Sequence, residues 1–410
     1  MKKILFAILL LVCASLEARE LTWEDVLKEA KQNNPSLKKA QSSLQQAEIN
    51  YSKSWANFLP QVSASASTGR SGSNSSSGST SNSIGVSASI SLFSGFSDTS
   101  ELSARNKDLE IEKMRYTRSL SDIIYNLKKS FITLLFAQES VQVSQKILER
   151  RTLNFELISV KYESGREDKG SFLRVEADKL QAEYDLKKAK RNLDVITIQL
   201  LKDMGIGKIE PITVIGDLSA LPEAQEVKIN EIIKNVPEYI IAQDNLEKAH
   251  YDIVSAKSVY YPGVSLSGGV SESGSSFPLD SNSWNARLGI SLPLYTGGKN
   301  KYNLQTAKQS KLILDNTFKE TVLNLYLKLN SYWNDLINSI DNAQLRQKYL
   351  DASSEQSKIN SQKYLNGLVT YNEWYSSEND YISSQRSLLD AKRDRILSEA
   401  LWHNALGREE

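Results

Sequence analysis

The sequence predicts a mainly α-helical, internally duplicated chain whose four β-strands suit the wall of a membrane β-barrel. Three observations favour this class. The 410 residues include only 8 prolines, with none between Pro60 and Pro211 and none after Pro293. Very long helices require such runs, because an interior proline removes a backbone hydrogen bond. One sequence pattern occurs twice, 202 residues apart, and each copy contains a segment that alternates polar and apolar residues as strands do.

The N-terminus predicts a secretory signal peptide at residues 1–18. The basic start MKK is followed by an apolar run that ends at the small residue Ala18, and such a run is too short to be a spanning helix. The alternative is a lipoprotein anchored at Cys13, but the three residues before Cys13 lack the small side chain expected there. Because Cys13 is the single cysteine, an exported chain would have no thiol for a disulfide or a metal site. No later run of 18 apolar residues predicts a transmembrane helix.

The duplication divides the chain into a first repeat, 19–205, and a second repeat, 227–410, joined by a linker at 206–226. Each repeat opens with an amphipathic helix that a proline ends, since the residue before a proline is pushed out of the α region. Chance matches would not keep one register over this length. The residues that recur at the constant offset include Pro35 and Pro237, Pro60 and Pro262, Gly95 and Gly297, and Gly205 and Gly407.

A β-hairpin follows in each repeat, at about 61–93 and 263–295. In SIGVSASISLF (83–93), apolar residues alternate with Ser and Gly, and the expected strands are about nine to eleven residues long, which suffices to cross a bilayer when tilted. The alternative is an unstructured Ser-rich linker, which the apolar alternation of the second repeat disfavours. The residues expected to face lipid are Ile84, Val86, Ile90, Leu288, Ile290 and Leu292.

A long helical hairpin completes each repeat. The first runs from about residue 98, turns at YESGREDKG (162–170) and returns with apolar residues at heptad spacing, as in a coiled coil. The second turns at YLNGLVTYN (364–372). The apolar stripes are sparse and leave wide polar faces, which indicates a large, water-filled assembly of helices.

The strand count predicts an oligomer. Four strands cannot close a barrel, since small closed barrels have about eight, and lipid does not tolerate an open sheet edge. The chain is therefore expected to pool strands with copies of itself, as a homodimer, homotrimer or homotetramer. Twelve strands from a trimer fit a water-filled bore best.

Composition argues against other classes of protein. The formal net charge is +1, so no nucleic acid partner is expected. His250 and His403 are the only histidines; the first is expected in mid-helix and the second lies near the terminus, and both are expected to be solvated rather than catalytic. TGGKNK (296–301) resembles a phosphate-binding loop, but Pro293 replaces its first glycine and no Ser or Thr follows Lys299. We predict no catalytic, cofactor-binding or metal-binding residues, and no enzymatic activity.

The order of the local motifs resembles the TolC outer-membrane efflux family over residues 21–407. The motifs are LTWEDVLKEAKQNNPSL, WANFLPQVSASAS, LFSGF, PLYTGGKNK, the two Y-x-x-G turns and the terminal NALG. The resemblance implies a homotrimer with a 12-stranded barrel in the outer membrane of a diderm bacterium and an α-helical tunnel in the periplasm. It further implies a passive exit duct for efflux or type I secretion, fed by a periplasmic adaptor and an inner-membrane pump of the RND or ABC type.

The same resemblance implies where the functional residues lie. The helix-hairpin tips would form the periplasmic entrance and dock the adaptor, and Glu373 would form a three-carboxylate ring that attracts cations. Ser171 occupies the equivalent place in the first repeat. The alternative for Glu373 is an ordinary solvated helix carboxylate. The candidate docking residues are Tyr162, Gly165, Tyr364, Gly367, Leu368, Val369 and Thr370.

A soluble periplasmic coiled-coil scaffold is the competing function. In that interpretation the hairpins would be surface flaps, and the protein would wash off membranes in high salt. A channel would stay in the outer-membrane fraction.

Overall fold

The computed structural model describes residues 19–73, 76–218 and 228–408. The predicted signal peptide, with Cys13 and Ala18, lies outside these residues. The elements are, in chain order, β1 (Arg19–Leu21), α2 (Trp23–Asn33), α3 (Pro35–Ser54), η1 (Trp55–Phe58), β2 (Gln61–Ser73), β3 (Ser76–Ser94), α4 (Ser97–Glu163), α5 (Lys169–Met204), β4 (Ile212–Val214), α6 (Ile229–Ile232), η2 (Ile233–Asn235), α7 (Pro237–Lys257), η3 (Ser258–Tyr260), β5 (Gly263–Gly274), β6 (Ser281–Ser291), α8 (Lys299–Leu365) and α9 (Tyr371–Ala405).

The predicted internal duplication is confirmed by these bounds. Helices α4 and α8 are each 67 residues long, about 100 Å at 1.5 Å per residue. They begin at Ser97 and Lys299, which are 202 positions apart, and the same offset separates the starts of β2 and β5 and of α5 and α9. Each repeat therefore builds the same series of helix, hairpin and helical hairpin.

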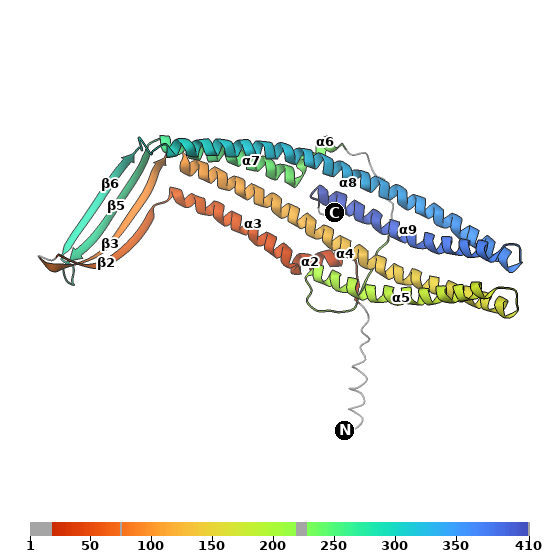
Figure 1. Cartoon of the computed structure of the whole chain (residues 1–410). Coiled ribbons are helices and arrows are strands. Elements are labelled where there is room, and N and C mark those ends of the chain that lie inside the picture. The colour runs from red at the N-terminus through yellow and green to blue at the C-terminus, as the bar shows by residue number, and fades with distance from the viewer. Residues whose placement is uncertain (1–18, 74–75, 219–227, 409–410) are drawn as a thin grey trace, which may run out of the picture. The chain divides into compact units, whose positions relative to one another are not determined.

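The chain divides into two compact units. The tip unit comprises the residues up to Lys39, Ser119–Ile233 and those from Tyr326 onward, and the sheet unit comprises Ala40–Arg118 and Lys234–Leu325. The turns between the long helices lie in the tip unit, and the four long strands lie in the sheet unit (Figure 1). Among the described helices, none is long and apolar enough to cross a membrane.

The largest core of the tip unit packs α2 and a two-stranded parallel sheet against α4, α5 and α9. Strand β1 pairs with β4, which is part of the segment expected to be the linker, from Arg19–Ile212 to Leu21–Val214. Helix α5 ends at Gly205 with φ +80°, and a Cβ there would lie 2.6 Å from the Asn33 carbonyl oxygen. This position therefore requires glycine. The buried members of the core are Leu21, Val26, Ala30, Leu127, Phe131, Ile132, Leu134, Leu135, Leu200, Leu201, Met204, Ile212, Val214, Leu218, Leu389 and Ile396.

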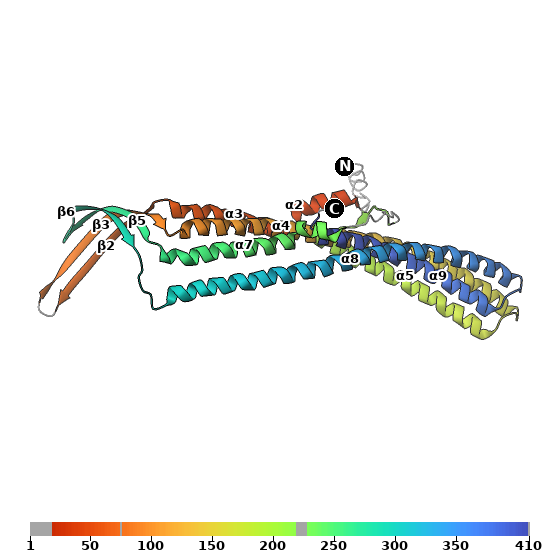
Figure 2. The same cartoon turned by 90° about the horizontal axis from the view of Figure 1, so that it is seen from above.

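The sheet unit holds one antiparallel sheet in the order β2-β3-β5-β6. Figure 2 shows the four strands side by side. The central β3–β5 ladder joins the hairpins of the two repeats, and β2 and β6 are the edges. Gly95, just after β3, has φ +65°, and a Cβ there would lie 2.3 Å from the Ser258 carbonyl oxygen. Only glycine can therefore occupy the end of this hairpin.

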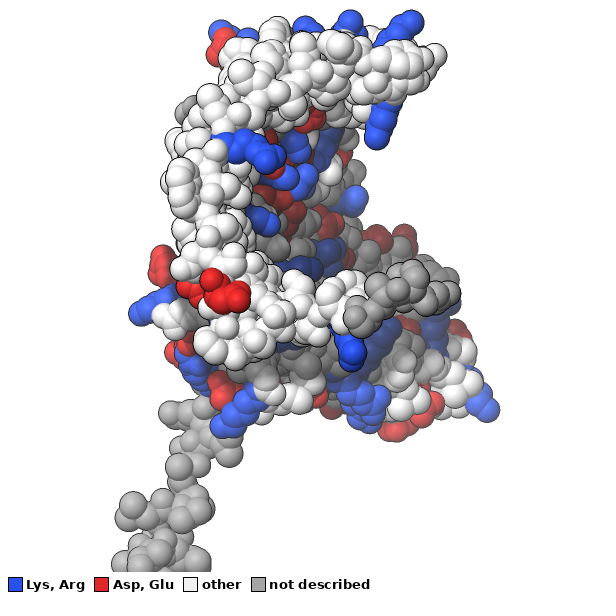
Figure 3. Space-filling model, turned by 90° about the vertical axis from the view of Figure 1, so that its left-hand side faces the viewer, with Lys and Arg blue, Asp and Glu red and all other residues white. Residues whose placement is uncertain are grey.

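The two faces of the sheet differ in polarity. One face carries Ser, Gly and Asn, and several serine pairs bridge neighbouring strands, such as Ser67 and Ser83 at 2.8 Å and Ser271 and Ser283 at 2.8 Å. The four strands contain three charged residues, and the sheet forms a largely uncharged band in Figure 3. The opposite face carries apolar rows across the strands: Phe93–Val264–Ile290, Ile90–Leu266–Leu288, Val62–Ala88–Gly268–Ala286 and Ala64–Val86–Val270–Trp284.

Two features of the strands differ from the sequence-based expectation. Strands β2 and β3 have 13 and 19 residues instead of nine to eleven, because the Ser-rich stretch expected to be a loop continues the ladder and pairs its hydroxyls across it. Strand β6 ends at Ser291, so Leu292 follows the strand and is not part of it, contrary to the expectation. Pro293 follows, and proline cannot donate to a ladder.

The apolar face is also interrupted where the sequence suggested regular alternation. Leu92 is the extra residue of a β-bulge, and Phe93 takes its expected place opposite Val264. Toward the loops, the last apolar row contains Ile84 beside Glu272 and Asn282. The apolar band therefore ends at a carboxylate and an amide.

Candidate functional site

Both turns of the tip unit follow the same local design. Helix α4 ends in a Schellman motif at Gly165 (φ +72°), with Arg166 N donating to Lys161 O at 2.8 Å. Helix α8 ends in the same way at Gly367 (φ +74°), with Leu368 N donating to Lys363 O at 2.8 Å. Glycine is favoured at both positions because the left-handed conformation penalises a Cβ. The Y-x-x-G sequences are thus helix stop signals.

The turns differ in how the returning helix is capped. Asp168 caps α5 by accepting a hydrogen bond from Ser171 N at 2.9 Å. Thr370 caps α9 and forms a capping box with Glu373: Glu373 N donates to Thr370 Oγ1, and Thr370 N donates to Glu373 Oε2 at 2.9 Å. These hydrogen bonds from Thr370 hold the pKa of Glu373 below its ordinary value. The carboxylate is exposed and ionised, and it caps α9 in addition to any role at an entrance.

The second turn presents apolar side chains to solvent. Leu368 is 72% exposed and Leu365 is 60% exposed. Val369 is half-buried and packs against the aromatic cluster below the turn. In the first turn, by contrast, Arg166 and Glu167 occupy the corresponding places. The most exposed apolar surface at the helix tips is therefore centred on Leu368.

An aromatic cluster fixes the two turns to each other. Tyr364 stacks on buried Trp374 with ring centroids 4.8 Å apart, and its hydroxyl donates to Glu167 of the other turn. Lys161 Nζ lies 3.6 Å from the Tyr364 ring centroid and donates to Tyr364 O. Burial raises the pKa of Tyr364, as does the Glu167 hydrogen bond, so the phenol remains a neutral donor. Tyr162 instead stacks on Phe172, at 5.0 Å, within its own hairpin.

Below the cluster, a buried ion pair joins the two helical hairpins. Arg150 of α4 donates to both carboxylate oxygens of Glu378 of α9, at 2.5 and 2.7 Å. Asn154 donates to Oε2 at 3.2 Å, and two serines of α8, Ser357 and Ser361, donate to Oε1 at 2.6 and 3.1 Å. Glu378 is 1% exposed. Three long helices thus meet on one carboxylate.

The Glu378 carboxylate stays ionised in this setting. Burial raises its pKa, but hydrogen bonds from Arg150 and Ser357 and the charge of Arg150 outweigh burial, and the net pKa is lowered. Glu378 was not singled out in the sequence analysis. The sequence spacing could have predicted the burial of Glu378. Tyr371, Trp374, Glu378 and Ile382 follow one another at intervals of three and four, which places Glu378 within the buried stripe of α9.

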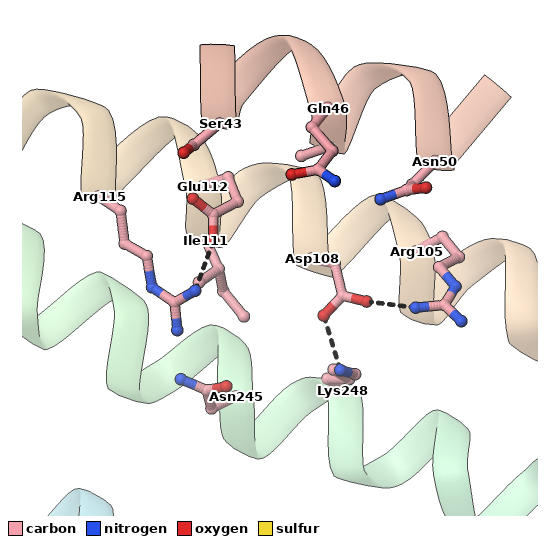
Figure 4. A pocket seen from close by; sticks show the side chains of 11 residues that line it. Ser43, Gln46, Asn50, Arg105, Asp108, Ile111, Glu112, Arg115, Asn245 and Lys248 are labelled. Atoms are coloured by element: carbon pink, nitrogen blue, oxygen red, sulfur yellow. Dashed lines mark hydrogen bonds and ion pairs between the residues drawn. The ribbon is translucent and has the colours of Figure 1, made fainter. Parts of the chain in front are cut away.

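A polar cavity of about 450 Å³ lies in the sheet unit, between α3, α4 and α7 (Figure 4). Three cations line it, but each faces a carboxylate: Arg105 and Lys248 contact Asp108, at 3.2 and 2.6 Å, and Arg115 contacts Glu112. These contacts compensate most of the positive charge of the lining. Lys107 likewise bridges α4 to Asp244 and Glu247 of α7, so charged contacts help to join these helices.

The duplicated fold has known relatives. The family model described as "Outer membrane efflux protein" matches residues 26–205 and 229–408. The chain belongs to this family. It is 22% identical to the probable outer membrane lipoprotein SilC of Salmonella typhimurium over 406 residues, 92% of this chain and 84% of SilC. It is 23% identical to the cation efflux system protein CusC of Escherichia coli (strain K12) over 418 residues, 93% of this chain and 85% of CusC.

Solved structures share the fold. A CusC structure matches with a TM-score of 0.85 at 20% identity, covering 94% of this chain and 92% of CusC. The open state of the Neisseria gonorrhoeae MtrE outer membrane channel matches with a TM-score of 0.84 at 20% identity, covering 94% and 89%. The TolC-like fold predicted from the sequence is confirmed.

Family membership decides between the two functions that the sequence left open. The protein is an outer membrane efflux channel, and the family match favours this function over the soluble periplasmic scaffold. The family is one of channel proteins rather than enzymes. The positions of the docking residues and of Glu373 in the assembled channel remain our predictions.

We predict that Glu378→Ala destabilises the tip unit by about 2 kcal/mol. Breaking a fully buried pair costs about 3–5 kcal/mol, and the cost here is lower because Arg150 is 33% exposed and can reach water. Because the folded-state pKa of Glu378 is lowered, its contribution is present above the unfolded pKa and is lost as the pH falls through the folded pKa. Hydrogen exchange of α9 amides measures the change.

Asp380→Ala is the matched control, since Asp380 is an exposed carboxylate two residues along the same helix. It should change stability by less than about 0.5 kcal/mol. Equal protection of α9 in both variants would show that the Glu378 network contributes no stability.

Proposed function

We propose that three copies of this chain close a twelve-stranded barrel in the outer membrane and continue into a periplasmic α-helical tunnel. The observation that carries the proposal is the four-stranded sheet, apolar on one face and Ser-rich on the other, with unpaired edges at β2 and β6. In lipid each unpaired backbone group costs several kcal/mol. The edges of one copy must therefore be paired by those of its neighbours.

The strand directions support closure by copies of the same chain. Neighbouring strands are antiparallel throughout the sheet, so β2 and β6 run in opposite directions. The β6 edge of one copy can thus pair with the β2 edge of the next without breaking the antiparallel pattern. The Ser-rich face would line a hydrated bore, and the apolar rows would face lipid.

The duct is passive, and transport depends on partners. We infer that the exposed apolar turn at Gly367, Leu368 and Val369 docks a periplasmic adaptor, which links the channel to an inner-membrane pump of the RND or ABC type. Tyr364 and Thr370 would support this turn from below through the aromatic cluster and the helix cap. Tyr162 and Gly165 shape the more polar first turn, which would contribute less to docking.

We predict that Leu288→Lys prevents assembly. Leu288 lies in the apolar row with Ile90 and Leu266 and is 63% exposed, and a lysine on the lipid face of a barrel costs about 2–4 kcal/mol near the bilayer midplane. Native mass spectrometry in detergent should give a trimer for the wild type and a monomer for the variant. Asn285→Lys on the Ser-rich face of the same strand is the control and should remain trimeric. Equal assembly of both variants would refute the barrel.

We predict that Leu368→Asp weakens adaptor capture about tenfold or more, since burying a leucine contributes on the order of 1.5–3 kcal/mol. The measurement is the yield of the adaptor that co-purifies with the wild-type channel after crosslinking in cells. Ser164→Asp, at an exposed position of the first turn, is the matched control and should retain the adaptor. Undiminished capture by Leu368→Asp would place docking elsewhere.

We predict that Glu373→Gln lowers the cation-to-anion permeability ratio in planar bilayers. Glutamine preserves the capping box and removes the charge, which the lowered pKa of Glu373 keeps ionised at neutral pH. The difference should vanish at about 1 M salt, where the Debye length is about 3 Å. Glu355→Gln, at an exposed site on α8 away from the turn, should leave selectivity unchanged. A Glu373→Gln channel with wild-type selectivity at low salt would leave Glu373 as a helix cap only.

A further inference from the structure

A cavity of about 420 Å³ in the tip unit is lined by cations and no carboxylate. It lies between α8 and α9 beside the end of the β4 segment. Arg395, Lys392 and Lys348 contribute the charges, and two glutamine amides add donors. The full lining is Leu218, Ala343, Gln344, Gln347, Lys348, Leu388, Lys392 and Arg395.

Arg395 is the unusual member of this lining. It is 2% exposed, and its Nε and Nη1 atoms have no hydrogen-bond partner within the described part of the chain. Glu399 approaches Nη1 at 3.6 Å, which supplies charge but no hydrogen bond. A guanidinium cannot escape burial by losing its proton, so its unpaired N–H groups retain their demand for an acceptor. Burial lowers the pKa of Arg395, and the charges of Glu399 and Asp217 offset this effect only in part.

We propose that the cavity binds a small organic oxyanion, a carboxylate or phosphate group on a short apolar body. The Arg395 fork, with Lys392 and Lys348 nearby, suits an oxyanion, because guanidinium geometry matches carboxylate and phosphate. Leu218, Ala343 and Leu388 offer an apolar wall for the body. The cavity volume is many times the roughly 30 Å³ that one water occupies, so the site has room for more than an inorganic ion.

The site is separate from the entrance and from the barrel. None of its residues belongs to the helix turns, to the Glu378 network or to the sheet unit. The proposal therefore stands independently of trimer closure and of adaptor docking, and it assigns the channel a ligand-binding function that a passive duct does not require.

Titration calorimetry of the assembled wild-type protein in a nonionic detergent tests the proposal with three probes. Octanoate has both an anionic group and an apolar chain. Inorganic phosphate has only the anionic group, and octanol has the apolar chain without a charge. Octanoate should bind at one per chain, at least tenfold more tightly than octanol. Tighter binding of phosphate than of octanoate would identify an inorganic ion as the ligand and overturn the organic assignment, and equal binding of octanoate and octanol would overturn the oxyanion site.

Arg395→Met tests the residue. Methionine has a similar length and no charge, so the variant should fold and should melt at or above the wild-type temperature without ligand, since replacing a poorly compensated buried charge by an apolar side chain is often stabilising. Its octanoate affinity should fall at least tenfold. Arg393→Met is the control on the same helix, because Arg393 pairs with Asp390 and Asp394 and does not line the cavity.

An equal loss of affinity in both arginine variants, or none in Arg395→Met, would overturn the assignment. If Arg395→Met does not fold, Arg395→Lys retains the charge without the planar fork and should bind octanoate more weakly than the wild type does. The comparison of octanoate with octanol on the wild type decides the proposal in either case.

Discussion

Backbone hydrogen bonding in lipid is the constraint on which this architecture depends. A strand that enters a bilayer must find a partner for every N–H and C=O group, and the chain provides three of the ladders it needs: β2–β3, β3–β5 and β5–β6. In the barrel proposed above, the fourth ladder comes from another molecule. An even number of strands per chain keeps the antiparallel alternation at that junction, so the same edge-to-edge contact can repeat around a ring. Under this proposal, oligomerisation is a condition for folding in the membrane rather than an addition to it.

In the helical part of the chain, the long helices have to be aligned with one another. These helices bury several apolar clusters, and polar contacts with defined geometry add to them. Glu378 draws α4, α8 and α9 together through five hydrogen bonds from four residues, and a carboxylate with so many donors tolerates little change of register. The aromatic stack of Tyr364 and Trp374 acts beside it. The apolar stripes of these long helices are compatible with several alignments. Specific polar contacts thus select one of them.

Local signals in the sequence predicted most of the fold. Proline spacing and the repeat gave the helices, alternation gave the strands, and the glycines of the two turns marked positions with positive φ. The features that the sequence did not predict depend on residues that are distant in the chain. The Ser-rich stretch became strand because its serines face serines across a ladder, and Glu378 became buried because Arg150 lies 228 positions away. The burial of Arg395 was likewise not predictable from the sequence, because its neighbours in the chain are charged residues typical of a solvated helix face.

The two repeats keep one backbone plan while their turns have diverged. A ring of identical half-length chains would have to carry the same turn at all six positions. Joining the halves into one polypeptide removes that obligation, because the turn at Gly367 can be hydrophobic while the turn at Gly165 is charged. In the proposed trimer the two kinds of turn would alternate around the rim. The internal duplication would then halve the rotational symmetry and double the number of distinct surfaces that evolution can adjust there.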